Sequence, residues 1–227
     1  GDIFEYMLGR GMSTMADDGQ YFTNRQICKL AFDLCFAIKQ TIRRPDGSLC
    51  TFADFFCGTG GFPAAFVKGA KLRDAGINWS EAIQQIYCLD KDMRSVTTTM
   101  LNLLILTGVP PRSSTIKMGD SFRDRINIVP EGFDGHFPNV QMDYILTNPP
   151  YGGDKTKGED FRFKYCRTDK ATKQKEYFVN QEIRSIGVED DDKVSAGVQL
   201  MMATLAPGGV AAIVLPQGFF FGTSNKA

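Results

Sequence analysis

Short apolar runs alternate with longer segments of helical periodicity over most of this chain. The apolar runs predict five strands, the last of which we expect to be fully buried, over residues 49–54, 86–90, 115–118, 143–147 and 210–215. Apolar residues at helical spacing predict helices between them, over residues 62–75, 93–106 and 194–205. Continuous apolar strands that alternate with helices are typical of an α/β fold with a doubly wound, mostly parallel sheet.

The first 45 residues predict a helical part that precedes this sheet. A short amphipathic stretch over residues 3–8 leads into a polar loop, after which Thr23 or Asn24 is suited to cap a helix. The chain of 227 residues is 43% apolar, so we expect a single domain with a short helical N-terminal segment. The N-terminal helix carries apolar residues at helical spacing, at Ile27, Leu30, Ala31, Leu34, Cys35 and Ile38.

Residues 152–190 interrupt the alternation of strands and helices. Residues 155–175 hold eight lysines and arginines against three acidic residues, and Phe161, Phe163 and Tyr165 alternate there with basic side chains. Basic residues interleaved with aromatic rings suit a nucleic-acid backbone and unstacked bases. The same pattern also suits a solvated insertion or a hairpin with one apolar face, and the residues alone leave these interpretations open.

Composition and charge argue against several kinds of site. The formal net charge is zero, so bulk electrostatics neither indicates nor excludes nucleic acid. The six cysteines form no CxxC pair, and several lie in apolar runs, which indicates reduced thiols and a cytoplasmic location. The one histidine, His136, stands among prolines and glycines, which argues against a histidine-based zinc site or a Ser-His-Asp triad, and we expect no metal.

The sequence shows no targeting or membrane segment. No apolar run approaches the ~20 residues that span a membrane, and no signal peptide is visible. The chain opens in a helix-like segment and stops shortly after a strand, so we expect it to be a fragment.

The first predicted strand ends in Asp54 and runs into a glycine-rich turn that opens the next helix. This order is the opening of an α/β nucleotide-binding unit, in which glycines let a ligand approach the backbone. The second strand ends in Asp90, at the position where such folds commonly bind ribose hydroxyls, and Asp120 follows the third. The glycine spacing does not fit the GxGxxG pattern of dehydrogenases.

The fourth predicted strand ends in a stiff corner made of Asn148, Pro149, Pro150 and Tyr151. Two consecutive prolines fix their φ angles and remove two N–H donors, so the corner is not helical. The Asn148 side-chain oxygen and a backbone carbonyl could accept from a planar NH2 group while Tyr151 stacks on it. Alternatively, the prolines only close a core strand and Asn148 is a turn residue.

The glycine-rich turn and the corner would both lie at the C-terminal ends of strands, where open α/β sheets bind ligands. Together they resemble the S-adenosylmethionine-dependent N6-adenine DNA methyltransferases, and most of all the methylation subunit of type I restriction-modification systems. Residues 54–60 match that family's Asp-Pro-x-Cys-Gly-Ser/Thr-Gly motif, with Phe55 in place of the proline. Residues 19–24 match its upstream motif, with Asn24 where the family usually has proline.

The likeness extends from about residue 1 to residue 222, with residues 1–45 as the helical N-terminal part and 152–190 as an insertion in one methyltransferase domain over 1–227. No counterpart of the family's target-recognition domain is evident. The resemblance implies that S-adenosylmethionine is the cofactor, with Asp90 on its ribose, Asp120 on its adenine amine and the upstream motif over its methionine part. The implied cofactor-binding set is Phe22, Thr23, Asp54, Cys57, Gly58, Thr59, Gly60, Asp90, Asp120 and Ser121.

The resemblance also implies the reaction, namely transfer of a methyl group to the N6 amine of a flipped adenine in DNA. Asn148, Pro149, Pro150 and Tyr151 would form the target-base motif, and a specificity or other partner subunit is implied. Three alternatives stay open: an RNA base as acceptor, a glutamine side chain of a protein as acceptor, and a subunit that binds the cofactor without catalysis.

Overall fold

The computed structural model describes residues 23–122, 141–151, 166–168, 175–177 and 193–221. Several predictions lie outside the described residues. They concern Phe22 and the rest of the upstream motif before Thr23, the stretch over residues 3–8, and the aromatic residues of the insertion. The single domain over residues 1–227 likewise stays a prediction.

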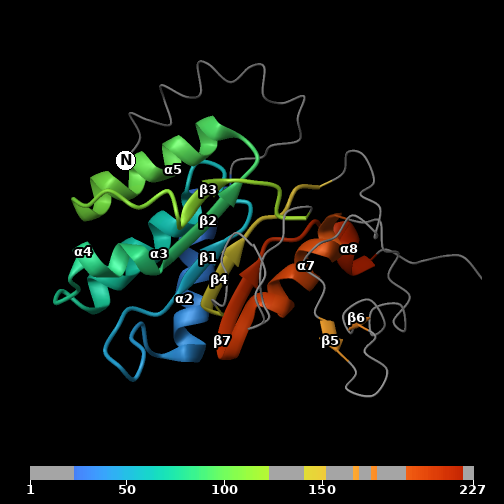
Figure 1. The fold of residues 1–227 in the computed structure, drawn as a ribbon, viewed down its shortest axis with the longest axis horizontal. Coiled ribbons are helices and arrows are strands. Elements are labelled where there is room, and N and C mark those ends of the chain that lie inside the picture. The colour runs from blue at the N-terminus through green and yellow to red at the C-terminus, as the bar shows by residue number, and fades with distance from the viewer. Residues whose placement is uncertain (1–22, 123–140, 152–165, 169–174, 178–192, 222–227) are drawn as a thin grey trace, which may run out of the picture.

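Five parallel strands form the sheet at the centre of the described structure (Figure 1). They are β1 (Phe52–Asp54), β2 (Ile86–Asp90), β3 (Ile116–Met118), β4 (Met142–Thr147) and β7 (Leu205–Ile213). Their order across the sheet is β3-β2-β1-β4-β7, so the predicted mostly parallel α/β sheet is confirmed. The chain builds outward from β1 through β2 to β3 and then returns to the other side of β1 with β4. The strand order therefore reverses between β1 and β4, which is where such sheets bind ligands.

Helices cover both faces of the sheet. The helices α2 (Arg25–Lys39), α3 (Gly61–Arg73) and α5 (Met93–Thr107) lie on one face, and α7 (Lys193–Thr204) lies on the other (Figure 1). Short elements complete the described chain: α4 (Trp79–Ala82), the 3-10 helix η2 (Ile83–Gln85) and α8 (Gln217–Phe221). The helices predicted over residues 62–75, 93–106 and 194–205 begin and end within one or two residues of the observed bounds. Because helices pack on both faces of the sheet, the fold is doubly wound.

Alternating strand residues supply two separate hydrophobic cores. Phe52 and Tyr144 face α2 and α3, where they pack with Phe32 and Phe66. The next residue along each strand, Ala53 in β1 and Ile145 in β4, belongs to the second core together with Leu200 of α7. Successive side chains of a strand point to opposite faces, so each strand serves both layers.

The buried face of α2 differs from the face that its apolar spacing suggests. Ile27, Leu30, Leu34 and Ile38 are between 45% and 75% exposed, whereas Cys28, Ala31, Phe32 and Cys35 are buried. The reason is the aromatic cluster around Phe32, whose ring meets the rings of Phe66 and Tyr144. Gly69 of α3 permits this approach, because a β-carbon there would lie 2.0 Å from the Phe32 ring.

The last strand differs from its prediction in both extent and burial. β7 begins at Leu205 rather than 210, and its pairing with β4 shifts register between Met142 and Tyr144. Only Val210 of this strand is buried, so the prediction of a fully buried strand was wrong. Within the described structure β7 is an edge strand, with a neighbour on one side alone.

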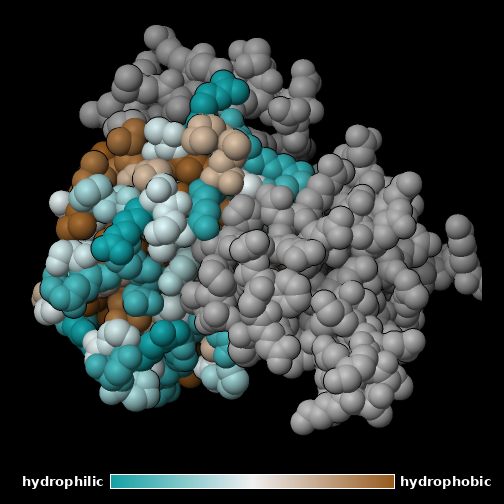
Figure 2. Space-filling model, viewed as in Figure 1, coloured by the Kyte–Doolittle hydropathy of each residue, from teal (hydrophilic) through white to brown (hydrophobic). Residues whose placement is uncertain are grey.

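Part of the insertion forms a small antiparallel pair, β5 (Cys166–Thr168) with β6 (Lys175–Tyr177). On the main domain, Figure 2 shows apolar residues at the surface around α5, where Leu101 and Ile105 are exposed. Across the residues that the structure covers, no helix has both the length and the apolar character that a membrane crossing requires.

Candidate functional site

The predicted site residues converge on the C-terminal edge of the sheet. β1 ends at Asp54, β2 ends at Asp90, and Asn148 follows the last residue of β4. β1 pairs directly with β4 on one side and with β2 on the other, so these three strand ends are neighbours. The structure therefore brings the glycine-rich turn and the Asn-Pro-Pro-Tyr corner together at the position where the strand order reverses.

The glycine-rich turn between β1 and α3 is held by side chains of α5. Gly58 and Gly60 both have positive φ angles, of 49° and 83°, which only glycine adopts without strain. Thr99 Oγ1 donates to the Gly58 carbonyl at 2.9 Å, and Asn102 Nδ2 donates to the Thr59 carbonyl at 2.7 Å. Thr99 and Asn102 were not predicted as site residues, because only tertiary packing brings α5 against the turn.

Asp54 is fully buried at the end of β1. Its Oδ1 accepts from Thr147 Oγ1 at 2.8 Å and from the Phe56 amide at 3.2 Å. Its Oδ2 is buried and has no hydrogen-bond partner among the described residues. Burial raises the pKa of Asp54 to about 7, although both hydrogen bonds lower it. A buried, unsatisfied acceptor is costly, so this oxygen is suited to a donor from a ligand.

Asp90 ties the end of β2 to the glycine-rich turn. Its Oδ2 accepts from the Gly58 amide at 2.8 Å, and its Oδ1 accepts from the Asp92 amide at 2.9 Å. Burial raises the pKa of Asp90, while these backbone donors lower it. Each carboxylate oxygen offers two lone pairs, so Asp90 keeps acceptor capacity for a further donor.

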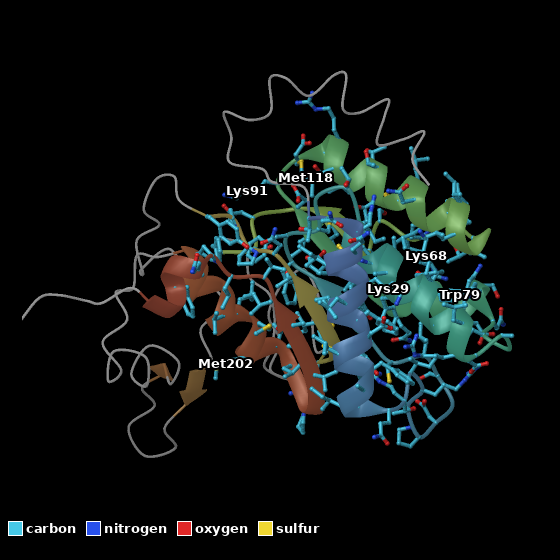
Figure 3. All side chains as sticks on the ribbon, turned by 180° about the vertical axis from the view of Figure 1, so that it is seen from behind. Lys29, Lys68, Trp79, Lys91, Met118 and Met202 are labelled. Atoms are coloured by element: carbon cyan, nitrogen blue, oxygen red, sulfur yellow. The ribbon has the colours of Figure 1, made fainter. Side chains whose placement is uncertain are left out.

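Asp120 follows β3 and is linked to the same edge. Its Oδ1 accepts from the Phe122 amide at 2.9 Å, and its Oδ2 lies 2.9 Å from Lys91 Nζ. Figure 3 shows Lys91 close to Met118, the register partner of Asp90 in β3. The neighbouring Ser121 hydroxyl donates to the Phe55 carbonyl, which ties this loop to the chain leaving β1. The ion pair with Lys91 was not predicted, because it depends on β2 and β3 being adjacent.

In the corner after β4, the side-chain amide of Asn148 has hydrogen-bond partners for both its nitrogen and its oxygen. Asn148 Nδ2 donates to Thr23 Oγ1 at 2.9 Å. The Tyr151 hydroxyl lies within hydrogen-bonding distance of Asn148 Oδ1 and 2.9 Å from the Val214 carbonyl. Asn24, not Thr23, caps α2, since its side chain accepts from the Gln26 amide at 2.8 Å. Thr23 is therefore free to orient the Asn148 side chain, which keeps a second lone pair on Oδ1.

Two further contacts join the corner to its surroundings. Pro149 packs against Gly197 of α7, and Thr147, the residue before Asn148, bonds Asp54. The sequence analysis missed Thr147 as a site residue. Its position between Asp54 and Asn148 becomes visible only when β1 and β4 are paired.

Cys57 lies in the turn but does not have the properties of a nucleophile. It is 4% exposed, and Thr99 Oγ1 lies 3.7 Å from its sulfur. The contact with Cys88 and burial raise the pKa of the Cys57 thiol well above its usual value. A thiol that stays protonated at neutral pH is a packing group.

A profile of the N-6 DNA methylase family matches residues 1–227 of the chain. The chain is 26% identical over 231 residues to the methylase subunit of the type I restriction enzyme EcoEI of Escherichia coli, covering all of the chain and 38% of that protein. It is 28% identical over 152 residues to the MjaIX methylase subunit of Methanocaldococcus jannaschii, covering 66% of the chain and 22% of that protein.

The fold is also similar to a solved structure, the methyltransferase subunit of a type I restriction-modification system from Streptococcus thermophilus. The TM-score is 0.55 at 17% identity, and the match covers 95% of the chain and 38% of that structure. The chain thus spans well under half the length of these relatives.

Proposed function

Because the chain belongs to the N-6 DNA methylase family, we propose that it transfers a methyl group from S-adenosylmethionine to the N6 amine of adenine in DNA. The observation that carries the proposal is the pairing of β1 with β4, since it makes Asp54 and Asn148 neighbours at one sheet edge. An acceptor for a cofactor and an acceptor for an amine thus lie side by side.

The cofactor half consists of the glycine-rich turn and the acids at the ends of β1 and β2. When bound, the cofactor supplies a methyl group that a positive sulfur already activates. The buried Asp54 Oδ2 fits the cofactor's cationic amine, because it is an acceptor without a donor in the described structure. A β-carbon on Gly58 would meet no described atom within 4 Å, so the backbone there leaves room for a ligand. Asp90 would accept from ribose hydroxyls and Asp120 from an adenine amine.

The target half consists of the corner after β4. Asn148 Oδ1 and the Pro149 carbonyl would accept from the two N–H bonds of the target amine and favour a more tetrahedral, more nucleophilic nitrogen. Thr23 Oγ1 accepts from Asn148 Nδ2, which would leave Asn148 Oδ1 as the group presented to the target amine. Positioning and exclusion of water would then supply most of the rate enhancement.

Access to this corner requires an extruded base. Adenine inside a duplex cannot reach a corner at the end of a buried strand, so the target nucleotide would leave the stack and Tyr151 would stack on it. Stacking would act on a ring whose hydroxyl lies within hydrogen-bonding distance of Asn148 Oδ1 and 2.9 Å from the Val214 carbonyl.

DNA selection would depend on parts beyond this chain. The EcoEI relative is a subunit of a restriction enzyme, and the chain spans 38% of its length. We propose that a specificity or other partner subunit reads the sequence, and that the reaction takes place in the cytoplasm, where the five described free cysteines stay reduced.

The test compares Asn148→Ala with wild type in the assembled holoenzyme, using S-adenosylmethionine with a radioactive methyl group. Unmethylated DNA, RNA and protein serve as separate acceptors, and nucleoside analysis locates the methyl group. We expect N6-methyladenine in DNA, a loss of roughly 100-fold or more in Asn148→Ala, and little change in cofactor affinity. Asn78→Ala is the matched control, because Asn78 caps α4, an element away from the strand ends.

Three outcomes would contradict the proposal. Methylation of RNA or protein without methylation of DNA would assign another acceptor. Cofactor binding without transfer to any acceptor would indicate a non-catalytic subunit. Wild-type transfer by Asn148→Ala would remove the target half from the mechanism.

A further inference from the structure

We infer that Thr147 is a positioning residue that joins the two halves of the site, by fixing one carboxylate oxygen of Asp54 and leaving the other for the cofactor amine. The inference rests on the proposed function, because it assigns a ligand to the oxygen that stays free.

The contacts of Thr147 hold it from two sides. It is the last residue of β4 and is 1% exposed. Its hydroxyl donates to Asp54 Oδ1 at 2.8 Å, and its carbonyl accepts from the Val214 amide at 3.0 Å. The side chain thus reaches the cofactor acid while the backbone leads directly into Asn148. Thr147 therefore connects the two halves of the site directly.

The hydroxyl also favours the charged form of Asp54. Burial raises the pKa of Asp54 to about 7, and the bonds from Thr147 and from the Phe56 amide act in the opposite direction. Thr147 supplies the only side-chain donor to Asp54 among the residues described by the structure. Without this hydrogen bond, the pKa of Asp54 would be higher, so the carboxyl would stay protonated up to a higher pH. A neutral carboxyl attracts a cationic amine much less than a carboxylate does.

Among the described titratable groups near Asp54, Asp90 acts against its ionisation. The charge of Asp90 at the end of β2 raises the pKa of Asp54. The pKa values of the Cys57 and Cys88 thiols are also raised, so these thiols carry no charge near neutral pH. Thr147 therefore opposes both burial and the neighbouring acid.

The first experiment measures the ionisation of Asp54 without any cofactor. Carbon-13 NMR of labelled aspartate follows the carboxyl signals with pH, and Asp54→Asn identifies the signal of Asp54 by its loss. We expect Thr147→Val to move the Asp54 midpoint up by roughly one pH unit, while Thr147→Ser keeps it near that of wild type. Thr204→Val is the matched control, since Thr204 is also fully buried but bonds the Leu200 carbonyl.

The second experiment measures the affinity of wild type and of Thr147→Val for S-adenosylmethionine at several pH values. The quantity compared is the ratio of the two affinities at each pH. Titration of the ligand's own amine affects both proteins equally and cancels in the ratio. We expect wild type to bind about ten-fold more tightly at pH 6, and the ratio to fall below about two-fold at pH 8.5. A merely structural loss would give a ratio that does not change with pH.

The outcomes separate the inference from the proposed function. An unchanged Asp54 midpoint in Thr147→Val, or an affinity ratio independent of pH, overturns the role of Thr147. Failure of wild type to bind the cofactor at any pH overturns the proposed function, and the NMR titration then still decides whether Thr147 controls Asp54. If Thr147→Val does not fold, Thr147→Ala serves as the variant without the hydroxyl.

Discussion

Asp54 carries the largest electrostatic cost among the acids of the site. Its carboxyl group is completely buried, with one oxygen bonded and the other unpartnered in the described structure. Burial raises its pKa from 3.8 in the unfolded chain to about 7 in the folded one. The protonated form therefore stabilises the fold below about pH 4, and this contribution is lost as the pH rises toward 7.

The pH dependence of stability should consequently differ between wild type and Asp54→Asn in the absence of cofactor. Between pH 5 and pH 8, wild type should lose about 2–3 kcal/mol more unfolding free energy than Asp54→Asn, which cannot ionise. Denaturant unfolding at several pH values measures this difference. Parallel curves would mean that Asp54 is ionised without cost, which would remove the basis for its role.

At the scale of elements, the turn between β1 and α3 depends on two glycines with different surroundings. A β-carbon on Gly60 would lie 2.9 Å from Thr99 Oγ1 and 3.1 Å from the Thr99 Cα, so α5 packs directly on this residue. A β-carbon on Gly58 would meet no described atom within 4 Å. Gly60 thus allows α5 to pack closely on the turn, whereas Gly58 leaves space at the strand ends.

The two alanine variants should separate these roles. Gly60→Ala should cost about 2–4 kcal/mol of unfolding free energy, from a left-handed φ and from overpacking against α5. Gly58→Ala should cost only about 1–2 kcal/mol of unfolding free energy, from the φ angle alone. It should nevertheless weaken binding of S-adenosylmethionine to the folded protein, because the new methyl group would occupy the space left for the ligand. Thermal unfolding and calorimetric titration of both variants check this. Equal affinities for wild type and Gly58→Ala would place the cofactor elsewhere.

At the scale of the whole molecule, a cluster of charged side chains around the buried Asp143 lies at the sheet edge opposite to the site. Asp143 near the start of β4 accepts from Arg44 Nε at 2.6 Å and from the Thr51 amide at 3.0 Å, and Lys39 Nζ lies 3.5 Å away. It therefore links α2, the turn before β1 and β4. Burial would raise the pKa of Asp143, but Arg44, Thr51 and Lys39 together hold it below its usual value.

Removing the Asp143 carboxylate should lower the free energy of unfolding. Asp143→Ala should cost about 2–4 kcal/mol at neutral pH, because it leaves the buried Thr51 amide without its side-chain acceptor and takes the carboxylate partner from Arg44 and Lys39. The lowered pKa means that this contribution exists above about pH 4 and disappears as the pH falls below it. Asp33→Ala is the comparison, since its ion pairs with Lys29 and Arg73 are more exposed and should be worth at most about 1 kcal/mol. Equal losses for the two variants would contradict the argument from burial.

The chemistry-bearing residues were predictable because they follow local rules. Asp54, Asp90 and Asn148 stand directly at the ends of apolar runs, and the ends of parallel strands share one edge of a sheet. The glycines of the turn likewise have the positive φ angles that their position suggests.

Residues that act through contacts between distant segments were not predictable. Thr147, Thr99 and Lys91 have ordinary identities, and their contacts with Asp54, Gly58 and Asp120 exist only because particular elements are adjacent. The orientation of α2 was missed for the same reason. The helical period alone allows two overlapping faces, and the aromatic cluster of Phe32, Phe66 and Tyr144 selects one.

The sequence by itself determined most of the strands and helices of the central sheet layer, the sheet class, and the acids and amide at the strand ends, because periodicity, glycine turns and diproline corners act within a few residues. Tertiary structure alone decided the strand order, the buried face of α2 and the bond that connects Asp54 to Thr147. These depend on which surfaces pack best across tens of residues, and no local pattern encodes that choice.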